Sequence, residues 1–448
     1  METYGCQMNK AESGCLEYEL QHRGWQPAFG PEDAEVVILN TCSVRKTAED
    51  RVWGRLGFYK TQKQNHSFRL VLMGCMGERL KQQILDQAPH VDLLVGNFQK
   101  HRLADVLDRA ETLPLTGHCV HTSTQLVEAG EYRFAGRHSV SGFRSFLPIM
   151  HGCNNFCTYC IVPYVRGPEV SRKPESIIEE IRALQNPPDP TARSVREITL
   201  LGQNVNSYRF REHDGTIVDF PDLLTRILPG LKENSWLRFL TSHPKDMSER
   251  LIDLIAVEPA LCRHIHLPVQ HGSDRILKAM GRKYTRRRYL DLVERIRKSI
   301  PEASLTTDIL IGFPGESDED YRLTLELMEQ VRFEDAFTYR YNPRQGTKAF
   351  RMGDDVPADV KQERLSGLID LQRRISREAR QRKVGRIVKV LIEGVSKKNP
   401  GELLGRSEGD EMVVFAGTPG LIGTFIRIHL KELRGSTFRG EPVHPGQG

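Results

Sequence analysis

Apolar and polar positions alternate in a regular order along the first hundred residues. Ala34–Leu39 and Phe68–Met73 are continuous apolar runs, and Val91–Val95 is a shorter one. Asn9–Gly24 carries apolar residues at helical spacing and ends on a glycine, which predicts an amphipathic helix. Buried strands that alternate with helices indicate an open, mostly parallel α/β sheet.

The middle of the chain repeats this order. The apolar run Phe146–Met150 predicts one strand, and five more strand candidates follow at Glu197–Leu201, Leu237–Leu240, His264–Leu267, Ser304–Ile311 and Phe337–Tyr341. Helical stretches are expected between them at Pro174–Leu184, Met247–Ala256 and Tyr289–Ile300. Six strands with intervening helices predict a partial (β/α)6 barrel, whose site would form at the carboxyl ends of the strands.

The last quarter has a different pattern. Lys361–Lys383 predicts a basic amphipathic helix, and from Gly385 the apolar period changes to two. The alternating runs Arg386–Ile392, Glu411–Phe415 and Gly423–Ile428 predict a small antiparallel β-barrel of OB-like character. We therefore expect an N-terminal open parallel α/β domain at 1–110, a linker at 111–138, the partial barrel at 139–378 and the small barrel at 379–442.

Composition narrows the class of protein. The 448 residues contain no run of eighteen apolar residues and no basic start followed by an apolar core, so we expect no membrane helix and no secretory signal. Nine cysteines, several beside glycines, do not resemble a secreted disulfide framework and favour reduced thiols in the cytoplasm.

The positive charge is unevenly distributed. The net charge is only +6, but Lys361–Lys398 holds twelve Lys and Arg against four Asp and Glu. Such a concentration attracts polyanions, although a solvated helix face is the commoner fate of a charge run. Its position beside an OB-like barrel favours an RNA-binding surface. Because aromatic residues are few there, we expect contacts with the RNA backbone more than base stacking.

Three cysteines at CxxxCxxC spacing form the strongest local signal. Cys153, Cys157 and Cys160, here called the loop triad, follow a predicted strand and the turn residue Gly152. Three thiolates on one short loop can hold an iron–sulfur cube and leave one iron open to a ligand. A zinc knuckle or spare buried thiols are the alternatives, but zinc would want a fourth ligand at suitable spacing.

Three further cysteines share a structural position. Cys6, Cys42 and Cys75, here called the N-terminal triad, each lie just past a predicted strand, which for Cys6 is a very short one. Because ligands bind at the carboxyl ends of strands in such sheets, we expect these thiols to meet and hold a second cluster, with structural cysteines as the alternative. Three others lack ligand context and are assigned to packing or exposure: Cys15 in a helix, Cys119 in an irregular connector and Cys262 near a barrel strand.

These motifs carry a family resemblance. The loop triad resembles the signature of the radical S-adenosylmethionine (SAM) enzymes, and Gly152–Gly167 resembles the methylthiotransferase branch. Tyr159 and Pro163–Tyr164 look more like the tRNA-modifying, MiaB-type members than those that act on a ribosomal protein. The N-terminal triad with its flanking residues resembles the amino-terminal domain of that family, and the tail resembles its RNA-binding TRAM domain.

The resemblance implies a reaction and its cofactors. Two [4Fe–4S] clusters are implied, one on each triad, with SAM on the open iron of the loop triad. Reductive cleavage of SAM would give a 5′-deoxyadenosyl radical that removes hydrogen from carbon 2 of isopentenyl-adenosine next to the anticodon, and the N-terminal cluster would supply the methylthio group. The loop triad is thus the catalytic set.

Cofactor contacts are expected from the loop triad's neighbourhood and the strand ends. The loop after the second strand would meet the methionyl amino group of SAM, and the glycine-bearing motif after the fifth strand would flank its adenine. The expected residues are Tyr159, Gly202, Gln203, Asn204, Ser242, Gln270, Asp308, Ile311, Gly312 and Glu316. Arg166 and Arg340 are open candidates for SAM or substrate contacts, and His243, His266 and His271 are either proton carriers or core histidines, with the core favoured for His266.

The expected partners are a tRNA anticodon stem-loop, an electron donor such as flavodoxin or ferredoxin, and a sulfur source, with the chain acting as a monomer away from membranes. Three alternatives remain open. A sister methylthiotransferase would act on threonylcarbamoyl-adenosine of tRNA or on a ribosomal-protein aspartate. An iron–sulfur electron carrier would need neither an open iron nor a basic tail, and a pure RNA-binding module would leave six placed cysteines without a role.

Overall fold

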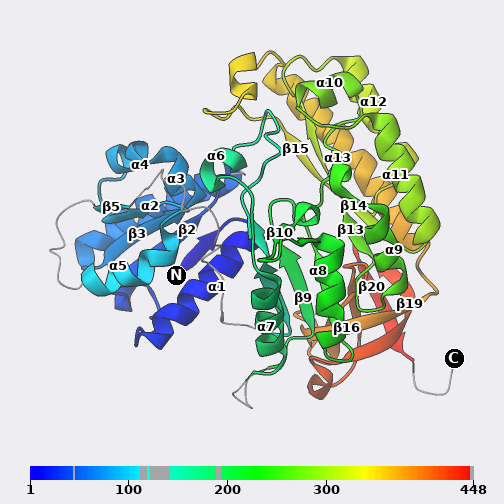
Figure 1. Cartoon of the computed structure of the whole chain (residues 1–448), viewed down its shortest axis with the longest axis horizontal. Helices are drawn as coiled ribbons and strands as arrows, with labels where there is room; N and C mark the ends of the chain where they lie inside the picture. The colour runs from blue at the N-terminus through cyan, green and yellow to red at the C-terminus, as the bar shows by residue number, and fades with distance from the viewer. Residues whose placement is uncertain (44–45, 111–118, 122–141, 188–192, 444–448) are drawn as a thin grey trace.

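A computed structural model describes residues 1–43, 46–110, 119–121, 142–187 and 193–443. Three bodies follow one another along the chain: an N-terminal α/β domain, a central half-barrel and a C-terminal β-barrel (Figure 1). The two ends of the chain lie on opposite sides of the molecule in this view. Among the described residues, no helix combines the length and the apolar character that crossing a bilayer requires.

The N-terminal domain is a five-stranded parallel sheet in the order β1-β2-β3-β4-β5. Apolar residues from both faces of the sheet pack beneath helices in two separate cores. Its strands are β1 Glu2–Tyr4, β2 Val36–Thr41, β3 Arg69–Gly74, β4 Leu93–Val95 and β5 Cys119–His121. Its helices are α1 Gln7–His22, η1 Pro31–Asp33, α2 Lys46–Asn65, α3 Cys75–Leu80, α4 Gln82–Gln87, η2 Lys100–Arg102 and α5 Leu103–Ala110.

The central body is an open half-barrel of six parallel strands in two sheets, β12-β9-β6 and β13-β14-β15. A parallel bridge between Leu237 and Leu261 joins them. The strands are β6 Arg144–Pro148, β9 Glu197–Leu201, β12 Trp236–Phe239, β13 His264–His266, β14 Ser304–Ile311 and β15 Asp335–Arg340. The surrounding helices are α6 Val162–Arg166, α7 Pro174–Gln185, α8 Phe220–Ile227, α9 Glu249–Val257, α10 Asp274–Ala279, α11 Arg286–Ser299, α12 Asp318–Val331 and α13 Ala358–Gln381.

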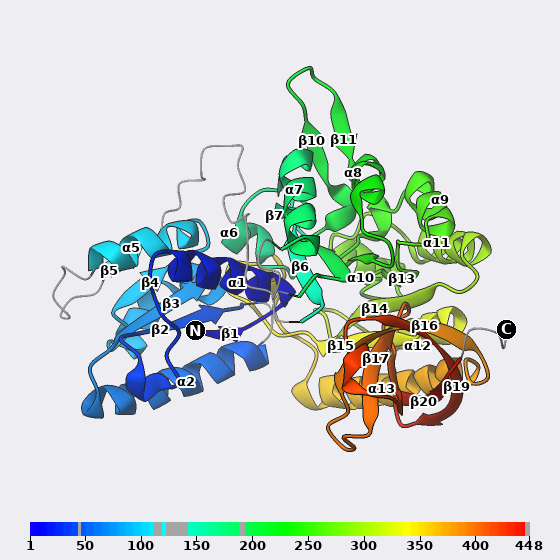
Figure 2. The same cartoon turned by 90° about the horizontal axis from the view of Figure 1, so that it is seen from below.

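Short elements decorate the half-barrel. The antiparallel pair β10 Arg209–Arg211 and β11 Ile217–Asp219 projects from it as a hairpin (Figure 2). β7 Met150–His151 pairs with β8 Val170–Ser171 and closes the base of the cysteine-bearing loop. Single 3-10 turns are η3 Val205–Ser207, η4 Leu228–Gly230, η5 Pro244–Asp246 and η6 Ala349–Met352.

The C-terminal barrel closes in the order β16-β17-β18-β20-β19. Its elements are β16 Ile387–Val395, β17 Glu402–Ser407, β18 Met412–Ala416, η7 Pro419–Leu421, β19 Phe425–Arg434 and β20 Thr437–Pro442. β18 and β20 pair in parallel, whereas the other four pairings are antiparallel. The predicted small barrel is therefore confirmed, with one parallel pairing that the sequence pattern did not indicate.

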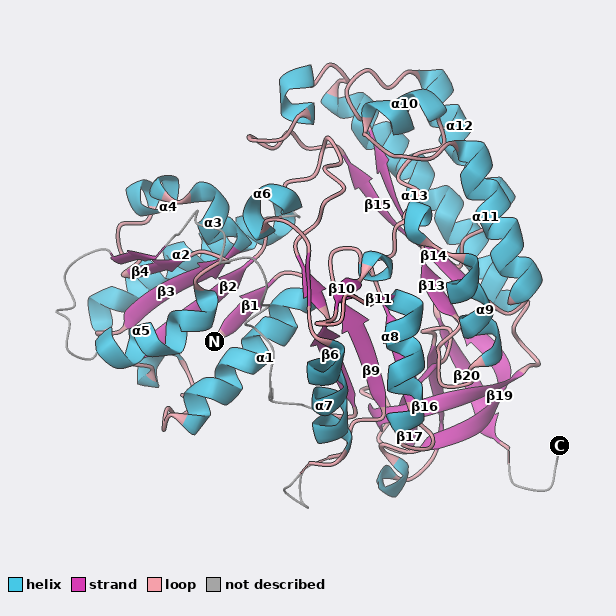
Figure 3. Ribbon diagram, viewed as in Figure 1, coloured by secondary structure: helices cyan, strands magenta, loops and turns pink. Residues whose placement is uncertain are grey.

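This barrel sits under the half-barrel, at the end where the strands begin (Figure 3). Glu408, in the turn between β17 and β18, accepts hydrogen bonds from the backbone N–H and the guanidinium of Arg263 at 3.0 and 3.1 Å. Arg238 donates to the Glu408 carbonyl at 2.9 Å. Trp236 and Phe425 pack edge to face across the junction. The open mouth of the half-barrel, where its strands end, therefore faces away from the C-terminal barrel.

Two details differ from the sequence prediction. Cys119 lies on β5 and pairs in register with Leu93 of β4, so three residues of the predicted linker extend the N-terminal sheet. β17 and β20 had no predicted counterpart, because glycines and charged residues interrupt their alternation. The rest of the linker, 111–118 and 122–138, lies outside the described residues. The short first strand is confirmed: β1 pairs with β2 over three residues.

Candidate functional site

The loop triad is fixed by a turn that only glycine fits well. Gly152 has φ +74°, and a Cβ at this position would lie 1.8 Å from the carbonyl oxygen of Pro168. The Cys153 N–H donates to the Gly167 carbonyl at 3.1 Å, which ties the start of the loop to the segment that leaves it. A glycine without a side chain is therefore what allows the loop to fold back on itself.

The far side of the loop is held by two other segments. The Thr158 N–H and hydroxyl donate to the Met280 and Ala279 carbonyls, at the end of α10, both at 2.9 Å. The Ala349 N–H of η6 donates to the Thr158 carbonyl at 2.8 Å. Both faces of this peptide unit are thus anchored, and the loop triad is held by backbone contacts from three parts of the half-barrel.

The N-terminal triad is built on strand ends, as the sequence predicts. Cys42 follows β2, Cys75 begins α3 directly after β3, and Cys6 follows β1. The thiols of Cys6 and Cys42 hydrogen-bond to each other. Gly74 has φ +100°, and a Cβ there would lie 2.5 Å from the Thr41 carbonyl oxygen. Close approach of neighbouring backbones therefore brings these cysteines together.

The structure brings the two triads to one surface. Cys75 packs against Ile161 and Val165, which follow the loop triad directly. The Asn97 side-chain amide donates both to the Cys75 sulfur at 3.3 Å and to the Val165 carbonyl at 2.8 Å. On the other side, Cys6 packs against apolar residues of the half-barrel's inner face. The N-terminal domain thus lies across the mouth with its thiols facing those of the loop.

A buried ion cluster joins the two domains beside the thiols. Glu12 of α1 is fully buried and accepts hydrogen bonds from Arg166 of α6 at 2.8 and 3.3 Å. Lys100 lies 2.5 Å from the same carboxylate. Burial raises the pKa of Glu12, but the positive charges of Arg166 and Lys100 outweigh it and lower that pKa to about 2. Arg166 is therefore an interdomain anchor.

The thiols of the two triads have opposite electrostatic surroundings. The hydrogen bond from Cys42 lowers the pKa of Cys6 to about 6, with help from Arg166 and against the effect of burial. Burial raises the pKa of Cys153. Burial, together with the neighbouring Cys157, raises the pKa of Cys160 to about 12. The N-terminal triad favours thiolates without a metal, whereas the loop triad favours thiols.

Both triads fit iron–sulfur clusters by their chemistry. Each offers three thiols without a disulfide, and thiolates are the usual ligands of such clusters. Within the described ranges, no group of three or more His, Cys, Asp or Glu is gathered around the position of a single ion. A cube of four irons spreads its ligands more widely than one ion does, so the spacing of these thiols is compatible with a cluster.

The expected SAM residues present unsatisfied polar atoms at the mouth. The side-chain oxygens of Gln203, Asn204 and Ser242 are buried without a hydrogen-bond partner among the described residues. They follow β9 and β12, where the strands end. Buried polar atoms are normally hydrogen-bonded, so these orphans fit a bound polar ligand such as the amino and carboxylate groups of SAM. The chain beside them is crowded: a Cβ on Gly202 would lie 2.4 Å from the Met150 side chain.

Gln270 and Asp308 lie together at the ends of β13 and β14. The Gln270 N–H donates to the Asp308 carbonyl at 2.9 Å, and Gln270 has φ +72°, a strained value for a residue with a side chain. The Asp308 carboxylate lies 3.6 Å from His266 Nε2. Tyr159 packs against the apolar cluster under α10, and burial raises its pKa well above the usual range.

The glycine-bearing motif after β14 is held by the protein itself. Ile311 ends β14 as a fully buried residue, and Gly312 follows with φ +66°. One carboxylate oxygen of Glu316 accepts from the Gly312 N–H at 2.7 Å and lies 3.1 Å from His271 Nε2, while the other accepts from Arg364 at 2.8 Å. Both oxygens of Glu316 are occupied, so its contacts give it the role of positioning the turn.

Other candidates separate clearly in the structure. Arg340 donates to Gln362 of α13 and so faces the outer helix, away from the mouth. His271 is fully buried and hydrogen-bonded, which is the core role. Burial lowers the pKa of His243 to about 2, with help from nearby positive charges, so this ring stays neutral.

One residue of the site was hidden in a basic block of the sequence. Arg282 donates to the Cys157 sulfur at 3.4 Å and to the Pro268 carbonyl at 2.9 Å. The sequence signal, a run of Lys and Arg, indicated only a polyanion surface. The adjoining Gly281, with φ +74° and close to Thr158, was the available hint that this arginine turns inward.

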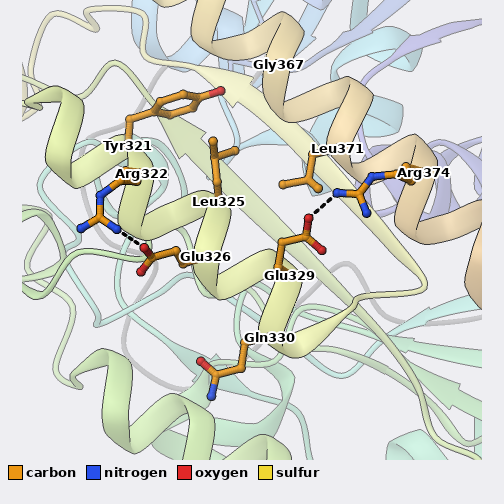
Figure 4. Close-up of a pocket in the computed structure, with 9 residues that line it drawn as sticks. All are labelled: Tyr321, Arg322, Leu325, Glu326, Glu329, Gln330, Gly367, Leu371 and Arg374. Carbon is orange, nitrogen blue, oxygen red and sulfur yellow. Dashed lines mark hydrogen bonds and ion pairs between the residues drawn. The ribbon is translucent and has the colours of Figure 1, made fainter.

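A groove of about 650 Å³ lies elsewhere, on the outer face between α12 and α13 (Figure 4). Its floor is formed by Tyr321, Leu325 and Leu371, and ion pairs of Arg322 with Glu326 and of Arg374 with Glu329 cross its rim. It contains no thiol and none of the expected cofactor residues. The chemistry therefore belongs to the mouth.

Comparison with family models divides the chain in the same order as the fold. The model of the Radical SAM superfamily matches residues 147–328. The model described as Uncharacterized protein family UPF0004 matches residues 1–96, and that of the TRAM domain matches residues 381–443. The two cysteine triads fall in the first two matches, and the closed barrel falls in the third.

Curated relatives match over almost the full length. A protein of Treponema denticola named tRNA-2-methylthio-N(6)-dimethylallyladenosine synthase is 48% identical over 98% of this chain and 98% of its own. Proteins of the same name from Treponema pallidum and Bacteroides thetaiotaomicron are 46% and 44% identical, each over 99% of this chain and over 98% and 95% of their own.

Among solved structures, the radical S-adenosylmethionine methyltransferase TsrM from Kitasatospora setae, with cobalamin and a [4Fe-4S] cluster bound, has the same fold. The TM-score is 0.53 at 15% identity, over 76% of this chain and 68% of that chain.

Proposed function

Because the chain belongs to the family of tRNA-2-methylthio-N(6)-dimethylallyladenosine synthases, we propose that it adds a methylthio group to carbon 2 of isopentenyl-adenosine next to the anticodon of tRNA. It is a radical SAM methylthiotransferase that uses a [4Fe–4S] cluster and SAM. The observation that carries the proposal is the meeting of two cysteine triads across the half-barrel mouth. The relatives do not favour the threonylcarbamoyl-adenosine or ribosomal-protein alternatives.

The residues of the loop triad would hold the cluster that binds SAM. When bound, this cluster and SAM supply the one-electron chemistry that removes hydrogen from an inert aromatic C–H bond. Backbone anchors at Gly152 and Thr158 hold the three thiols in place. Gln203, Asn204 and Ser242 would accept or donate hydrogen bonds to the methionyl end of SAM. Gly312 would let the backbone approach the adenine, with Glu316 positioning that turn.

The N-terminal triad would hold a second [4Fe–4S] cluster, which is the source of the transferred sulfur in the family that the sequence resembles. Support comes from the strand-end placement of Cys6, Cys42 and Cys75 and from their contact with the loop. A base must leave the stacked anticodon loop to reach a site between the two triads. The mouth lies on the open end of the half-barrel, where such a base could enter.

Further partners belong to the same proposal. One-electron reduction calls for a donor such as flavodoxin or ferredoxin, and repeated turnover calls for a sulfur source. Since one chain supplies both triads, the enzyme would act as a monomer, and a tRNA substrate would place it in the cytoplasm. The anticodon stem-loop would be bound partly by the C-terminal barrel, an architecture that often binds oligonucleotides.

The test combines metal analysis with product analysis. Anaerobically reconstituted enzyme should contain about eight irons per chain, as expected for two [4Fe–4S] clusters. Incubation with SAM, a reductant and tRNA that carries isopentenyl-adenosine should give nucleosides with a methylthio mass gain. About four irons and unchanged nucleosides would leave a one-cluster radical enzyme and would reject this substrate.

A further inference from the structure

Two aromatic side chains are exposed on the loop that holds the cysteines. Phe156, directly before Cys157, is 48% exposed, and Tyr164 of α6 is 46% exposed. Their rings lie 6.2 Å apart at 81°, edge to face. Phe156 has φ +48°, a conformation that a bulky residue adopts only when its surroundings hold it there. The protein thus presents an aromatic pair to solvent beside the loop triad.

The segment 342–353, here called the rim segment, runs along the same opening. It leaves β15 and extends toward the N-terminal domain (Figure 1, yellow to gold). Ala349 bonds to Thr158 of the cysteine loop, and Arg344 reaches Glu49 of α2 at 3.1 Å. The rim segment is therefore anchored to the loop triad and to the N-terminal domain, and it borders both.

The outer side of the rim segment is apolar and positive. Phe350 is 46% exposed and Met352 is 47% exposed. Lys348 and Arg351 are exposed, and neither side chain has a hydrogen bond or ion pair in the part of the chain that the structure describes. Exposed aromatic rings interleaved with unpaired cations are the combination that binds single-stranded nucleic acid, because bases stack on the rings and phosphates meet the charges.

The C-terminal barrel does not offer this combination. Its Phe415 and Phe438 are buried in the barrel core, and Phe425 packs on Trp236. The basic run that begins at Lys361 is largely neutralised by acidic neighbours, in pairs such as Arg364 with Asp318 and Arg374 with Glu329. Stacking contacts and free positive charge are found at the mouth.

We propose that Phe156, Tyr164, Lys348, Phe350 and Arg351 form a binding surface for the unstacked anticodon-loop nucleotides that flank the modified base. The inference rests on the proposed function, since it takes the RNA substrate from there, and adds where the loop is held. The aromatic residues stack on bases, and the two cations bind the adjoining phosphates. The single-stranded loop is therefore bound at the mouth, and the C-terminal barrel binds the stem.

The test measures equilibrium binding of a synthetic anticodon stem-loop RNA to the reconstituted enzyme over a range of KCl concentrations. Phe350→Ala should weaken binding by about tenfold or more and leave the salt dependence unchanged, because a stacking contact releases no counterions. Lys348→Ala combined with Arg351→Ala should lower the log–log salt slope by about 1.4, since each phosphate contact on a single strand contributes about 0.7.

Matched controls lie on exposed surface away from the mouth. Phe29, which is fully exposed, follows α1 at the end of that helix remote from Cys6, and Lys298 lies on α11. Phe29→Ala and Lys298→Ala should match wild-type affinity and slope. Phe156→Leu is a second aromatic variant. Iron content, measured on every preparation, separates damage to the loop triad from loss of an RNA contact.

The outcomes distinguish the rim surface from the proposed function. Rim variants that retain iron and bind RNA as tightly as the controls do would overturn the inference, even if transfer of electrons from a protein donor were slowed. Weaker binding in the rim variants alone supports it. An unmodified stem-loop serves as a second probe. If the wild-type enzyme binds it but never modifies tRNA, the proposed reaction fails, and the effect of the rim variants on binding still decides the surface.

Discussion

The N-terminal triad and the loop triad meet at one surface, but the protein treats their thiols differently. Cys6 shares a hydrogen bond with Cys42 and feels the positive charge of Arg166, and its pKa falls to about 6. In the loop triad, burial dominates and raises the pKa values of Cys153 and Cys160. The N-terminal triad is thus electrostatically prepared for its ligands, whereas the loop triad depends on the bound cluster to keep its thiolates.

The difference agrees with two separate roles. A site that must bind and cleave SAM benefits from a dry pocket with an open metal position. A site that presents sulfur to a substrate can be more polar, with Asn97 donating to Cys75 and Arg166 close by. The comparison therefore predicts that damage to one triad should be separable from damage to the other.

The largest effect should come from removing one ligand of each triad. Cys157→Ala should reduce SAM cleavage to background, because the cluster that binds SAM loses one of three ligands. Cys75→Ala should retain cleavage and abolish methylthio transfer. The measurement is 5′-deoxyadenosine by chromatography beside nucleoside mass spectrometry. Equal loss of cleavage in both variants would contradict the two-role assignment.

The glycines before the triads should separate them in the same way. A Cβ on Gly152 would meet the Pro168 carbonyl at 1.8 Å, and one on Gly74 would meet the Thr41 carbonyl at 2.5 Å, both at positive φ. Gly152→Ala and Gly74→Ala should each lose about half of the bound iron, and only the first should lose SAM cleavage.

Gly24→Ala is the matched control for the glycine variants. Gly24 has φ +94°, but nothing lies within 4 Å of the Cβ that alanine would add. It should cost only about 1–2 kcal/mol for the left-handed backbone and keep all the iron. Iron loss of similar size in this variant would mean that backbone conformation, and not the contact beside each triad, explains the result.

The buried ion cluster offers a smaller, pH-dependent effect. Glu12→Gln leaves Arg166 and Lys100 without a buried counter-charge, which should destabilise the protein by about 3–5 kcal/mol at pH 7. The folded-state pKa of Glu12 is about 2, below its ordinary 4.5, so its ionisation stabilises the fold fully above about pH 4.5 and less as the pH falls toward 2.

The difference in thermal stability between wild type and Glu12→Gln should therefore narrow as the pH is lowered from 7 to 4, and calorimetry measures it. Glu19, on the same helix, pairs with Arg23 at the surface. Glu19→Gln should cost no more than about 1 kcal/mol. A gap for Glu12→Gln that stays constant with pH would show that the loss comes from packing alone.

Much of this fold is predictable from the sequence because its strands are buried runs between glycines and helices. β9 and β14 have the predicted bounds, since continuous apolar runs end at Gly202 and Gly312. β17 and β20 escaped prediction because their inner and outer positions are set by closure of the barrel. The cysteine triads are predictable for a local reason: short spacing in one and strand ends in the other.

The remainder of the site depends on contacts that sequence periodicity does not show. Arg282 belongs to a basic block, but tertiary packing buries it against Cys157. Arg166 and Glu12 are 154 positions apart, and only the docking of the two domains makes them a pair. The rim segment has no regular pattern, so its course along the mouth follows from its anchors at Thr158 and Glu49.

The smallest expected effect concerns the contact that joins the triads. Asn97→Ala removes the hydrogen bonds to the Cys75 sulfur and the Val165 carbonyl, which should cost about 1–2 kcal/mol of stability. Because the loop triad keeps all its own anchors, SAM cleavage should be retained while methylthio transfer falls several-fold, about 1 kcal/mol on the barrier.

Asn186→Ala, which removes a hydrogen bond to Arg182 at an exposed helix end, provides the control and should leave both activities unchanged. The informative quantity is the ratio of methylthio product to 5′-deoxyadenosine, since a general loss of folded enzyme lowers both equally. A lower ratio in Asn97→Ala means that the distance between the triads limits transfer. An unchanged ratio would mean that each triad is positioned by its own domain, and that Asn97 contributes to stability alone.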